Sequence, residues 1–197
     1  MTAITLASAS AARTAILAGA GVIFATAPAD LDEAAVKSEL LTGGIGPRQI
    51  AERLADIKAT TVSGGRGGLV IGADQTLELD GRLYDKPNDL AHARQQLIDL
   101  RGRAHSLHAA VSLARDGQII WREAQTARLT MRAFSDAFLD QYLCRNGDGI
   151  LGSVGGYQLE SEGAQLFDHI EGDYFAILGL PLFGLLSALR RQGALDI

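Results

Sequence analysis

The order of hydrophobic and polar positions along the chain predicts strands and helices in mixed succession. A short apolar run at 2–7 is typical of a buried strand. Ser10 then stands where the N-cap of a helix would be, and Gly19 and Gly21 would end that alanine-rich helix. Because residues 22–24 are again apolar, the chain is expected to begin as strand, helix, strand.

The middle of the chain gives sharper signals. Proline at the first position and apolar residues at helical spacing predict a helix over 47–60. The apolar run 69–73 predicts a strand that ends at Asp74. Asp80-Gly81, between two segments of alternating polarity, predicts a hairpin.

The second half of the chain continues the mixture. The expected elements are a helix capped by Asn88, strands over 105–114 and 118–130 joined at Asp116-Gly117, a helix from Ser135 to Gly147, a hairpin over 165–178 with Gly172-Asp173 near its turn, and a last helix from Pro181 to Gly193. Because strands and helices mix without a repeat, the fold class is α/β or α+β, with a mixed sheet and flanking helices. The length of 197 residues fits one domain over 1–197.

Composition and charge narrow the function classes. The formal net charge of -5 argues against a nonspecific nucleic-acid surface, yet a pocket for a small phosphorylated ligand needs only two or three cations. Two uncharged stretches, 14–29 and 174–189, are interpreted as core segments and not as an export signal or a membrane span. The lone Cys144 cannot form an internal disulfide, which favours the cytoplasm, and its place on an amphipathic helix predicts a buried thiol.

Two glycine-rich segments invite nucleotide-binding interpretations that their details oppose. Gly19-Ala20-Gly21 lacks the third glycine of a dinucleotide fingerprint and ends a helix where the fingerprint would begin one. The run 63–68 lacks the Gly-Lys-Ser/Thr ending of a phosphate-binding loop, so we interpret it as a surface turn.

Several single residues could bear chemistry. A strand end followed by a helix start offers free N–H groups, and Arg13 adds a cation, so an anion site is predicted there; the alternative is that Ser10 is only a cap and Arg13 only solvated. Asp74, at the end of its strand, could hold a divalent cation or orient a water, or be a plain surface carboxylate. Taken singly, Lys58, at the end of its helix, and Lys86 are interpreted as solvated lysines.

The histidines argue against a zinc site. His105 and His108 are three residues apart on an expected strand, which places them on opposite faces.

Read in chain order, these signals form a longer pattern. Its blocks are Leu6-Ala7-Ser8-Ala9-Ser10 with Arg13, Asp32-Glu33, Leu54-Ala55 with Lys58-Ala59, Gly72-Ala73-Asp74-Gln75-Thr76, Asp85-Lys86-Pro87, Arg101-Gly102 with His105, Glu162-Gly163-Ala164 with Phe167, Ile170-Glu171-Gly172-Asp173-Tyr174 and Gly179-Leu180-Pro181-Leu182. Together they resemble the Maf family of nucleoside triphosphate pyrophosphatases over nearly the whole chain.

The resemblance implies the fold and the reaction. It implies two lobes around a central cleft, a homodimer, and hydrolysis of a nucleoside triphosphate to a monophosphate and pyrophosphate with magnesium or manganese. It also implies a role in removing unwanted nucleotides and in arrest of cell division.

The resemblance further implies roles for nine residues. Glu33 and Asp74 would hold the metal or activate water, Asp74 being the base, with Lys86 also counted as catalytic. The residues that would bind substrate are Ser8, Ser10, Arg13, Lys58, Gln75 and Glu160.

The chain departs from the family pattern at a few positions. Many members carry a proline and a second arginine where this chain has Ala11 and Ala12, so one phosphate contact is lost. Gln75 together with Glu160 is more similar to the subgroup acting on 7-methyl-GTP than to the one acting on dTTP and UTP, but the preferred base stays open. Two alternatives remain, a noncatalytic nucleotide-binding regulator and another phosphate-handling enzyme such as a sugar-phosphate hydrolase.

Overall fold

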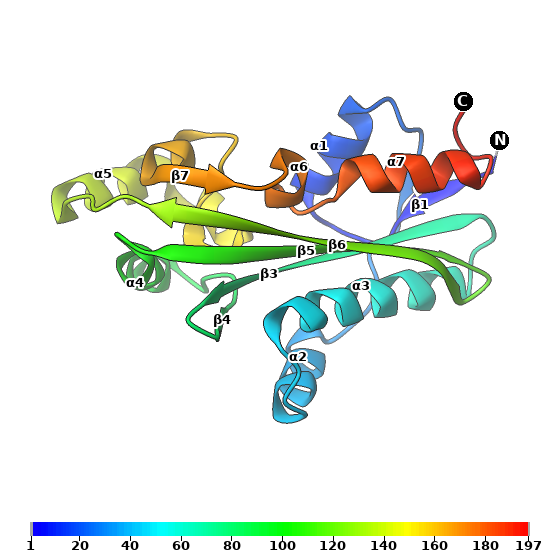
Figure 1. Cartoon of the computed structure of the whole chain (residues 1–197), viewed down its shortest axis with the longest axis horizontal. Helices are drawn as coiled ribbons and strands as arrows, with labels where there is room; N and C mark the ends of the chain where they lie inside the picture. The colour runs from blue at the N-terminus through cyan, green and yellow to red at the C-terminus, as the bar shows by residue number, and fades with distance from the viewer. Residues whose placement is uncertain (1, 197) are drawn as a thin grey trace.

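A mixed seven-stranded sheet forms the framework of the molecule (Figure 1). The computed structural model describes residues 2–196. The strands are β1 (Ile4–Leu6), β2 (Ala25–Thr26), β3 (Leu69–Leu79), β4 (Arg82–Tyr84), β5 (Ala104–Arg115), β6 (Gln118–Met131) and β7 (Phe167–Glu171). Their order is β2-β1-β3-β5-β6-β7, with β4 paired to β3. The mixed α/β class expected from the sequence is confirmed.

Seven α-helices flank the sheet in the described part of the chain. They are α1 (Ala11–Gly19), α2 (Glu33–Thr42), α3 (Pro47–Ser63), α4 (Leu90–Leu100), α5 (Asp136–Asn146), α6 (Tyr174–Ile177) and α7 (Leu182–Arg191), with 3₁₀ turns at Gly147–Gly152, Val154–Gly156 and Glu162–Leu166. None of the helices within 2–196 combines the length and apolarity that crossing a bilayer requires.

The long central strands are joined by the tight turns that the sequence predicted. Asp80 and Gly81 have φ of 51° and 79°, and Asp116 and Gly117 have φ of 51° and 76°. Two successive positive φ values are what a two-residue type I′ hairpin needs, and Asp-Gly supplies them at low cost. The hairpins β3–β4 and β5–β6 follow directly from these turns, whereas the antiparallel pairing of β3 with β5 joins strands that β4 and α4 separate in the chain.

One edge of β3 has a gap in its pairing, and Asp74 lies in it. β1 pairs with β3 at 69–71 and β4 pairs at 77–79, while β5 occupies the whole opposite edge. Asp74 therefore stands in the middle of an eleven-residue strand and not at its end, which corrects the expectation. The polar pair Asp74-Gln75 looked like a terminus, but the β5 partner continues through Ala110 and Ala109.

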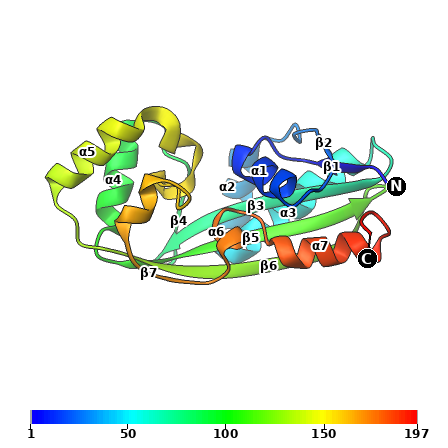
Figure 2. The same ribbon diagram turned by 90° about the horizontal axis from the view of Figure 1, so that it is seen from above.

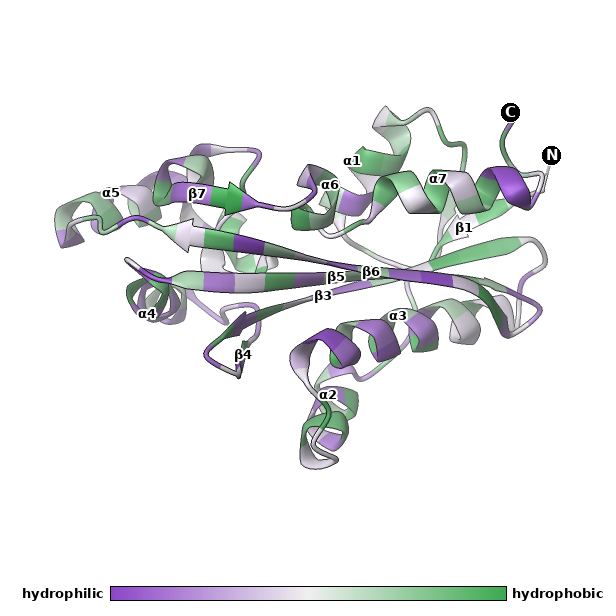
Figure 3. Ribbon diagram, in the orientation of Figure 1, coloured by the Kyte–Doolittle hydropathy of each residue, from purple (hydrophilic) through white to green (hydrophobic). Residues whose placement is uncertain are grey.

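Two large apolar cores lie at the two ends of the sheet, and a small third cluster of alanines, Ala51, Ala55 and Ala110, lies between α3 and β5. One packs α4 and α5 on the far end of the sheet, around Leu97, Leu129 and Tyr142. The other packs α1 and α7 against β1 and the start of β3, around Leu17 and Leu185. Figure 2 shows these two groups at opposite ends of the long strands. In Figure 3 the last turn of α7 is strongly hydrophilic, as expected for Arg190 and Arg191 at a helix C-terminus.

Several local expectations are confirmed at the helix ends. The Ser10 hydroxyl accepts a hydrogen bond from the N–H of Arg13, and Ser135 caps α5. Pro47 opens α3. One cap was misplaced: the residue that caps α4 is Asp89, not Asn88, and its carboxylate accepts from the His92 N–H at 2.7 Å.

Other expectations are wrong for non-local reasons. Residues 22–24 form no strand, and β2 begins only at Ala25. The segment 165–178 is not a hairpin, because β7 pairs with the distant β6 and Asp173 caps α6. Cys144 is exposed and not buried, since α5 directs Leu139 and Tyr142 to the core instead.

Candidate active site

A cleft of about 1120 Å³ opens between the two halves of the molecule. The start of α1, the helix α2 and the end of α3 line one part of it, together with the gap on β3. The segment 149–160 and α6 line the other. Of the nine residues singled out from the sequence, eight line this cleft: Ser10, Arg13, Glu33, Lys58, Asp74, Gln75, Lys86 and Glu160.

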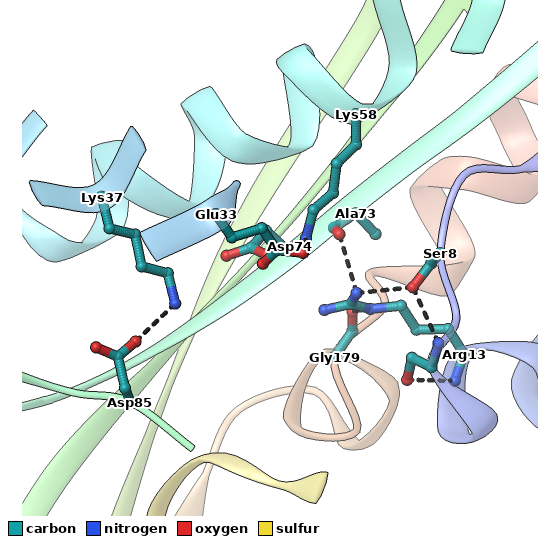
Figure 4. A network of polar contacts seen from close by, with 10 residues as sticks. Ser8, Arg13, Glu33, Lys37, Lys58, Ala73, Asp74, Asp85 and Gly179 are labelled. Atoms are coloured by element: carbon teal, nitrogen blue, oxygen red, sulfur yellow. Dashed lines mark hydrogen bonds and ion pairs between the residues drawn. The ribbon is translucent and has the colours of Figure 1, made fainter. Parts of the chain in front are cut away.

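Arg13 fills the gap on the edge of β3. Its Nη1 donates to the Ala73 carbonyl at 2.9 Å and to Ser8 Oγ at 3.2 Å, and its Nε donates to the Gly179 carbonyl at 2.9 Å (Figure 4). Burial lowers the pKa of the Arg13 guanidinium from its usual value, against the attraction of Asp74 and Glu33. The side chain is thus a fixed cation whose orientation the backbone sets.

Ser8 acts behind Arg13 and not in the cleft wall. Its Oγ accepts from the Ser10 N–H and from Arg13 Nη1, both at 3.2 Å, and the residue is 7% exposed. Ser8 therefore orients Arg13, whereas the Ser10 hydroxyl lies in the cleft and can donate to an anion.

Lys58 joins the two acidic residues of the cleft. Its Nζ lies 2.7 Å from Asp74 Oδ1 and 2.9 Å from Glu33 Oε1. The residue is 6% exposed, so the interpretation of Lys58 as a solvated lysine at a helix end is wrong. Burial opposes ionisation of Glu33, but Lys58, with help from Lys37 and Lys86, holds the pKa of Glu33 below its usual value.

Asp74 offers one oxygen that the protein leaves free. Its Oδ2 is buried and has no hydrogen-bond partner among the described residues. An orphaned carboxylate oxygen is costly to keep unless a ligand or a cation uses it. Mg²⁺ in phosphate sites is commonly held by one or two carboxylates plus substrate oxygens, so the Asp74 and Glu33 pair suits such an ion, although residues 2–196 form no cage of three acidic, His or Cys ligands.

Lys86 and Lys37 complete the cationic part of the cleft. Lys86 follows β4; desolvation and the nearby Arg13 cation lower the pKa of its amine, against the pull of Glu33. Lys37, on α2, makes an ion pair of 2.7 Å with Asp85. Sequence reasoning missed Lys37 as a site residue. The available signal was its position four residues after Glu33, which places both on one side of a helix.

The other part of the cleft is less charged. Val154, Leu159 and Leu178 contribute partly exposed apolar side chains, Leu107, Tyr157 and Ile177 are buried in its wall, and Glu160 is exposed. The Gln75 Nε2 donates to the carbonyls of Ala176 at 3.1 Å and Ile177 at 2.8 Å, so its Oε1 is the atom left to face a ligand.

A buried histidine supports the aromatic wall. His105 Nε2 lies 2.7 Å from the Tyr157 hydroxyl, and burial lowers the His105 pKa to about 4. His108 faces the other side of β5, toward Thr126 and Glu78, as the spacing predicted. The neutral His105 thus fixes a ring that lines the cleft.

Comparison with known proteins places this geometry in a family. The family model described as Maf-like protein matches residues 3–192. A protein of Caulobacter vibrioides named nucleoside triphosphate pyrophosphatase is 57% identical over 197 residues, covering 100% of this chain and 99% of its own length. A Brucella abortus protein named 7-methyl-GTP pyrophosphatase is 48% identical over 192 residues, with 97% and 96% covered. The family model spans nearly the whole chain and includes every element that lines the cleft. This chain therefore belongs to the Maf family.

Proposed function

We propose that the protein hydrolyses a nucleoside triphosphate to a nucleoside monophosphate and pyrophosphate. The observation that carries this proposal is the convergence of Arg13, Lys58 and Lys86 on the same cleft as Asp74. A triphosphate carries about four negative charges, and its cleavage is helped chiefly by positioning and by neutralising charge on the leaving group. The names of the relatives from Caulobacter and Brucella support the same reaction.

The chemistry assigns distinct tasks to the side chains. Arg13, Ser10, Lys58 and Lys86 hold the phosphates. A water oxygen attacks the α-phosphorus, the bond from that phosphorus to the bridging oxygen breaks, and its electron pair leaves with pyrophosphate. Asp74 takes the proton from the water, and Oδ2 is the atom free to accept it. Such a base is worth roughly 10²–10⁴ in rate.

We propose that a divalent cation, Mg²⁺ or Mn²⁺, assists this reaction. Asp74 and Glu33 are the residues that would hold it, since both are carboxylates in the cationic part of the cleft. When bound, such an ion neutralises charge on the phosphate oxygens.

The apolar part of the cleft is the place for the base and sugar. Val154, Leu159 and Leu178 line the cleft with partly exposed side chains and give a flat base an apolar surface, while Gln75 Oε1 and Glu160 offer acceptors for N–H groups. Acceptors of this kind fit a guanine edge, and Glu160 adds attraction for the positive charge of a 7-methylated guanine.

The decisive experiment is product analysis. Purified protein with Mg²⁺ or Mn²⁺ is incubated with GTP, 7-methyl-GTP, dTTP and UTP, and the products are separated by ion-exchange chromatography. Monophosphate and pyrophosphate in equal amounts are expected. Release of inorganic phosphate would instead favour a phosphatase acting on other phosphate esters, and the absence of any product in all assays would favour a noncatalytic nucleotide-binding regulator.

Two further properties belong to the proposal. A cytoplasmic location is supported by the single exposed thiol of Cys144, which suits a reducing compartment, and by the nucleotide substrate. A homodimer is supported by the family resemblance and by two exposed aromatic residues, Tyr174 on α6 and Phe183 on α7. They are 49% and 62% exposed, and each packs edge-on against Phe175. Sedimentation velocity of the intact protein tests the second.

A further inference from the structure

Every lysine of this chain lines the same cleft. The sequence holds three lysines, Lys37, Lys58 and Lys86, and the other basic residues apart from histidine are all arginines, of which only Arg13 lines the cleft. Arginine carries its charge on a rigid planar group, whereas lysine carries a compact charge on a flexible stem. The three N–H donors of a lysine can therefore turn from one anion to another. The concentration of this one residue type in the cleft marks all three as functional cations, including Lys37, which the reaction as derived above does not use.

Lys37 is placed to reach a ligand held by the other cations. It lies one turn after Glu33 on α2, so both side chains are on the side of the helix that faces the cleft (Figure 4). The side chain of Lys37 is 18% exposed, and among the described residues it pairs only with Asp85, whose side chain is 59% exposed. Asp85 directly precedes Lys86 and also lines the cleft.

Little besides two ion pairs fixes the position of α2, the helix that carries Lys37. No residue of α2 is buried, and in Figure 1 the helix projects from the body of the molecule beside α3. Two ion pairs connect it to the walls of the cleft, Glu33 to Lys58 and Lys37 to Asp85. An anion that draws on Lys37 and Lys58 therefore acts on the contacts that position α2.

We propose that Lys37 is an additional ligand of the polyphosphate tail, and that it exchanges Asp85 for phosphate oxygens when substrate binds, which draws α2 over the tail. This inference rests on the proposed function, because it concerns the same cleft and the same anion. A polyphosphate carries several charges, whereas Asp85 is one exposed carboxylate, so the exchange favours the ligand. Burial would lower the pKa of the Lys37 amine, but Asp85 holds it above its usual value, so the ammonium is charged at neutral pH.

Opposite substitutions within the Lys37–Asp85 pair test the proposal. Calorimetry measures the affinity of inorganic pyrophosphate, with Mg²⁺ present, for the wild type, Lys37→Met, Asp85→Asn and the control Arg94→Met, which removes a surface cation paired to Asp140. We expect Lys37→Met to weaken binding about tenfold or more, because a charged hydrogen bond is lost. Asp85→Asn, which removes the competitor for Lys37, should bind as tightly as the wild type or more tightly.

A purely structural ion pair gives a different result, since either substitution breaks it. The proposal is therefore overturned if Asp85→Asn weakens pyrophosphate binding, if Lys37→Met binds like the wild type, or if Arg94→Met loses as much affinity as Lys37→Met. Pyrophosphate binding needs no turnover, so the affinities of the variants can be compared even if the protein cleaves no triphosphate. The proposal for Lys37 can therefore fail while the proposed hydrolysis stands, and the reverse.

Because the chain has only three lysines, each of them can be followed separately by NMR, which provides a second test. Reductive methylation with ¹³C keeps the charge of each amine and gives three lysine side-chain signals plus the α-amino group, with the Lys37 signal identified by its loss in Lys37→Met. Pyrophosphate should shift the Lys37 signal together with those of Lys58 and Lys86. A Lys37 signal that stays in place while the other two move would refute its role as a ligand.

Discussion

Lys58 Nζ lies 2.7 Å from Asp74 Oδ1 and belongs to a helix that packs directly on the strand bearing that aspartate. The same ammonium is 2.9 Å from Glu33 Oε1 on α2. One buried cation thus aligns the two carboxylates while leaving Asp74 Oδ2 unpartnered. In the proposed reaction, substrate phosphates that draw Lys58 toward themselves would release the carboxylates for metal and water, and this contact would then link binding to catalysis.

Asp74→Asn should abolish turnover while sparing nucleotide binding. The amide keeps the shape of the side chain but cannot accept a proton from water, so kcat is expected to fall by about 10²–10⁴ or more. Steady-state assays give kcat, and calorimetry with intact triphosphate gives the affinity, which should stay within severalfold of the wild type. Activity near the wild-type level would show that another group is the base.

Lys86→Ala should weaken binding and turnover together. If its amine neutralises phosphate charge in the bound substrate, and does so more strongly in the transition state as charge shifts to the leaving pyrophosphate, KM should rise and kcat should fall. Arg66→Ala, in the exposed turn after α3, removes a cation outside the cleft and serves as the control. A rise in KM with kcat unchanged would instead show that Lys86 binds the substrate and the transition state equally.

The sequence predicted the elements whose causes are local. Asp80-Gly81 and Asp116-Gly117 determine their turns by their own backbone preferences, and Pro47 and Ser135 mark helix starts by the same kind of local chemistry. The elements that were predicted wrongly or missed depend on contacts between segments far apart in the chain. The partner of β7 is β6, well upstream in the chain, so residues near 165–178 carry no sign of it. The helix α2 was missed because it buries no apolar face.

The candidate site, like the fold, could be predicted only where the cause is local in the sequence. Taken singly, Lys58 looked solvated and Asp74 looked terminal, because burial depends on which segments pack together. Only the order of many blocks along the chain, through the resemblance to a family, joined them. Lys37 lay outside those blocks, and its relation to the cleft became visible only when α2 was placed beside Asp85.

Gly72→Ala should destabilise the fold and disturb the site at once. A Cβ at this position would collide with the Ala55 carbonyl oxygen and lie 2.6 Å from the Ala59 N, so α3 would have to move away from β3. Overpacking of this kind costs about 1–3 kcal/mol in the free energy of unfolding, measured by urea denaturation. Because Lys58 precedes Ala59, activity should fall as well.

The control for this glycine is Gly19→Ala at the end of α1, where an added Cβ meets no atom within 4 Å. It should leave the free energy of unfolding nearly unchanged. If Gly72→Ala proved equally harmless, the close packing of α3 on β3 would not be what holds Lys58 against Asp74.

His105 should make the stability of the fold depend on pH. Burial lowers its pKa from 6.5 to about 4, so between these values the unfolded chain binds a proton that the folded protein excludes. This contribution to stability is complete above pH 6.5 and is lost as the pH falls toward 4, by up to about 3 kcal/mol.

Urea denaturation at pH 7 and pH 4.5 measures the loss for the wild type and for His105→Gln, which has no group titrating in this range. The variant should lose less stability on acidification, whatever its stability at pH 7. Equal losses in the two proteins would mean that His105 is protonated in the folded state and that its contact with Tyr157 tolerates the charge.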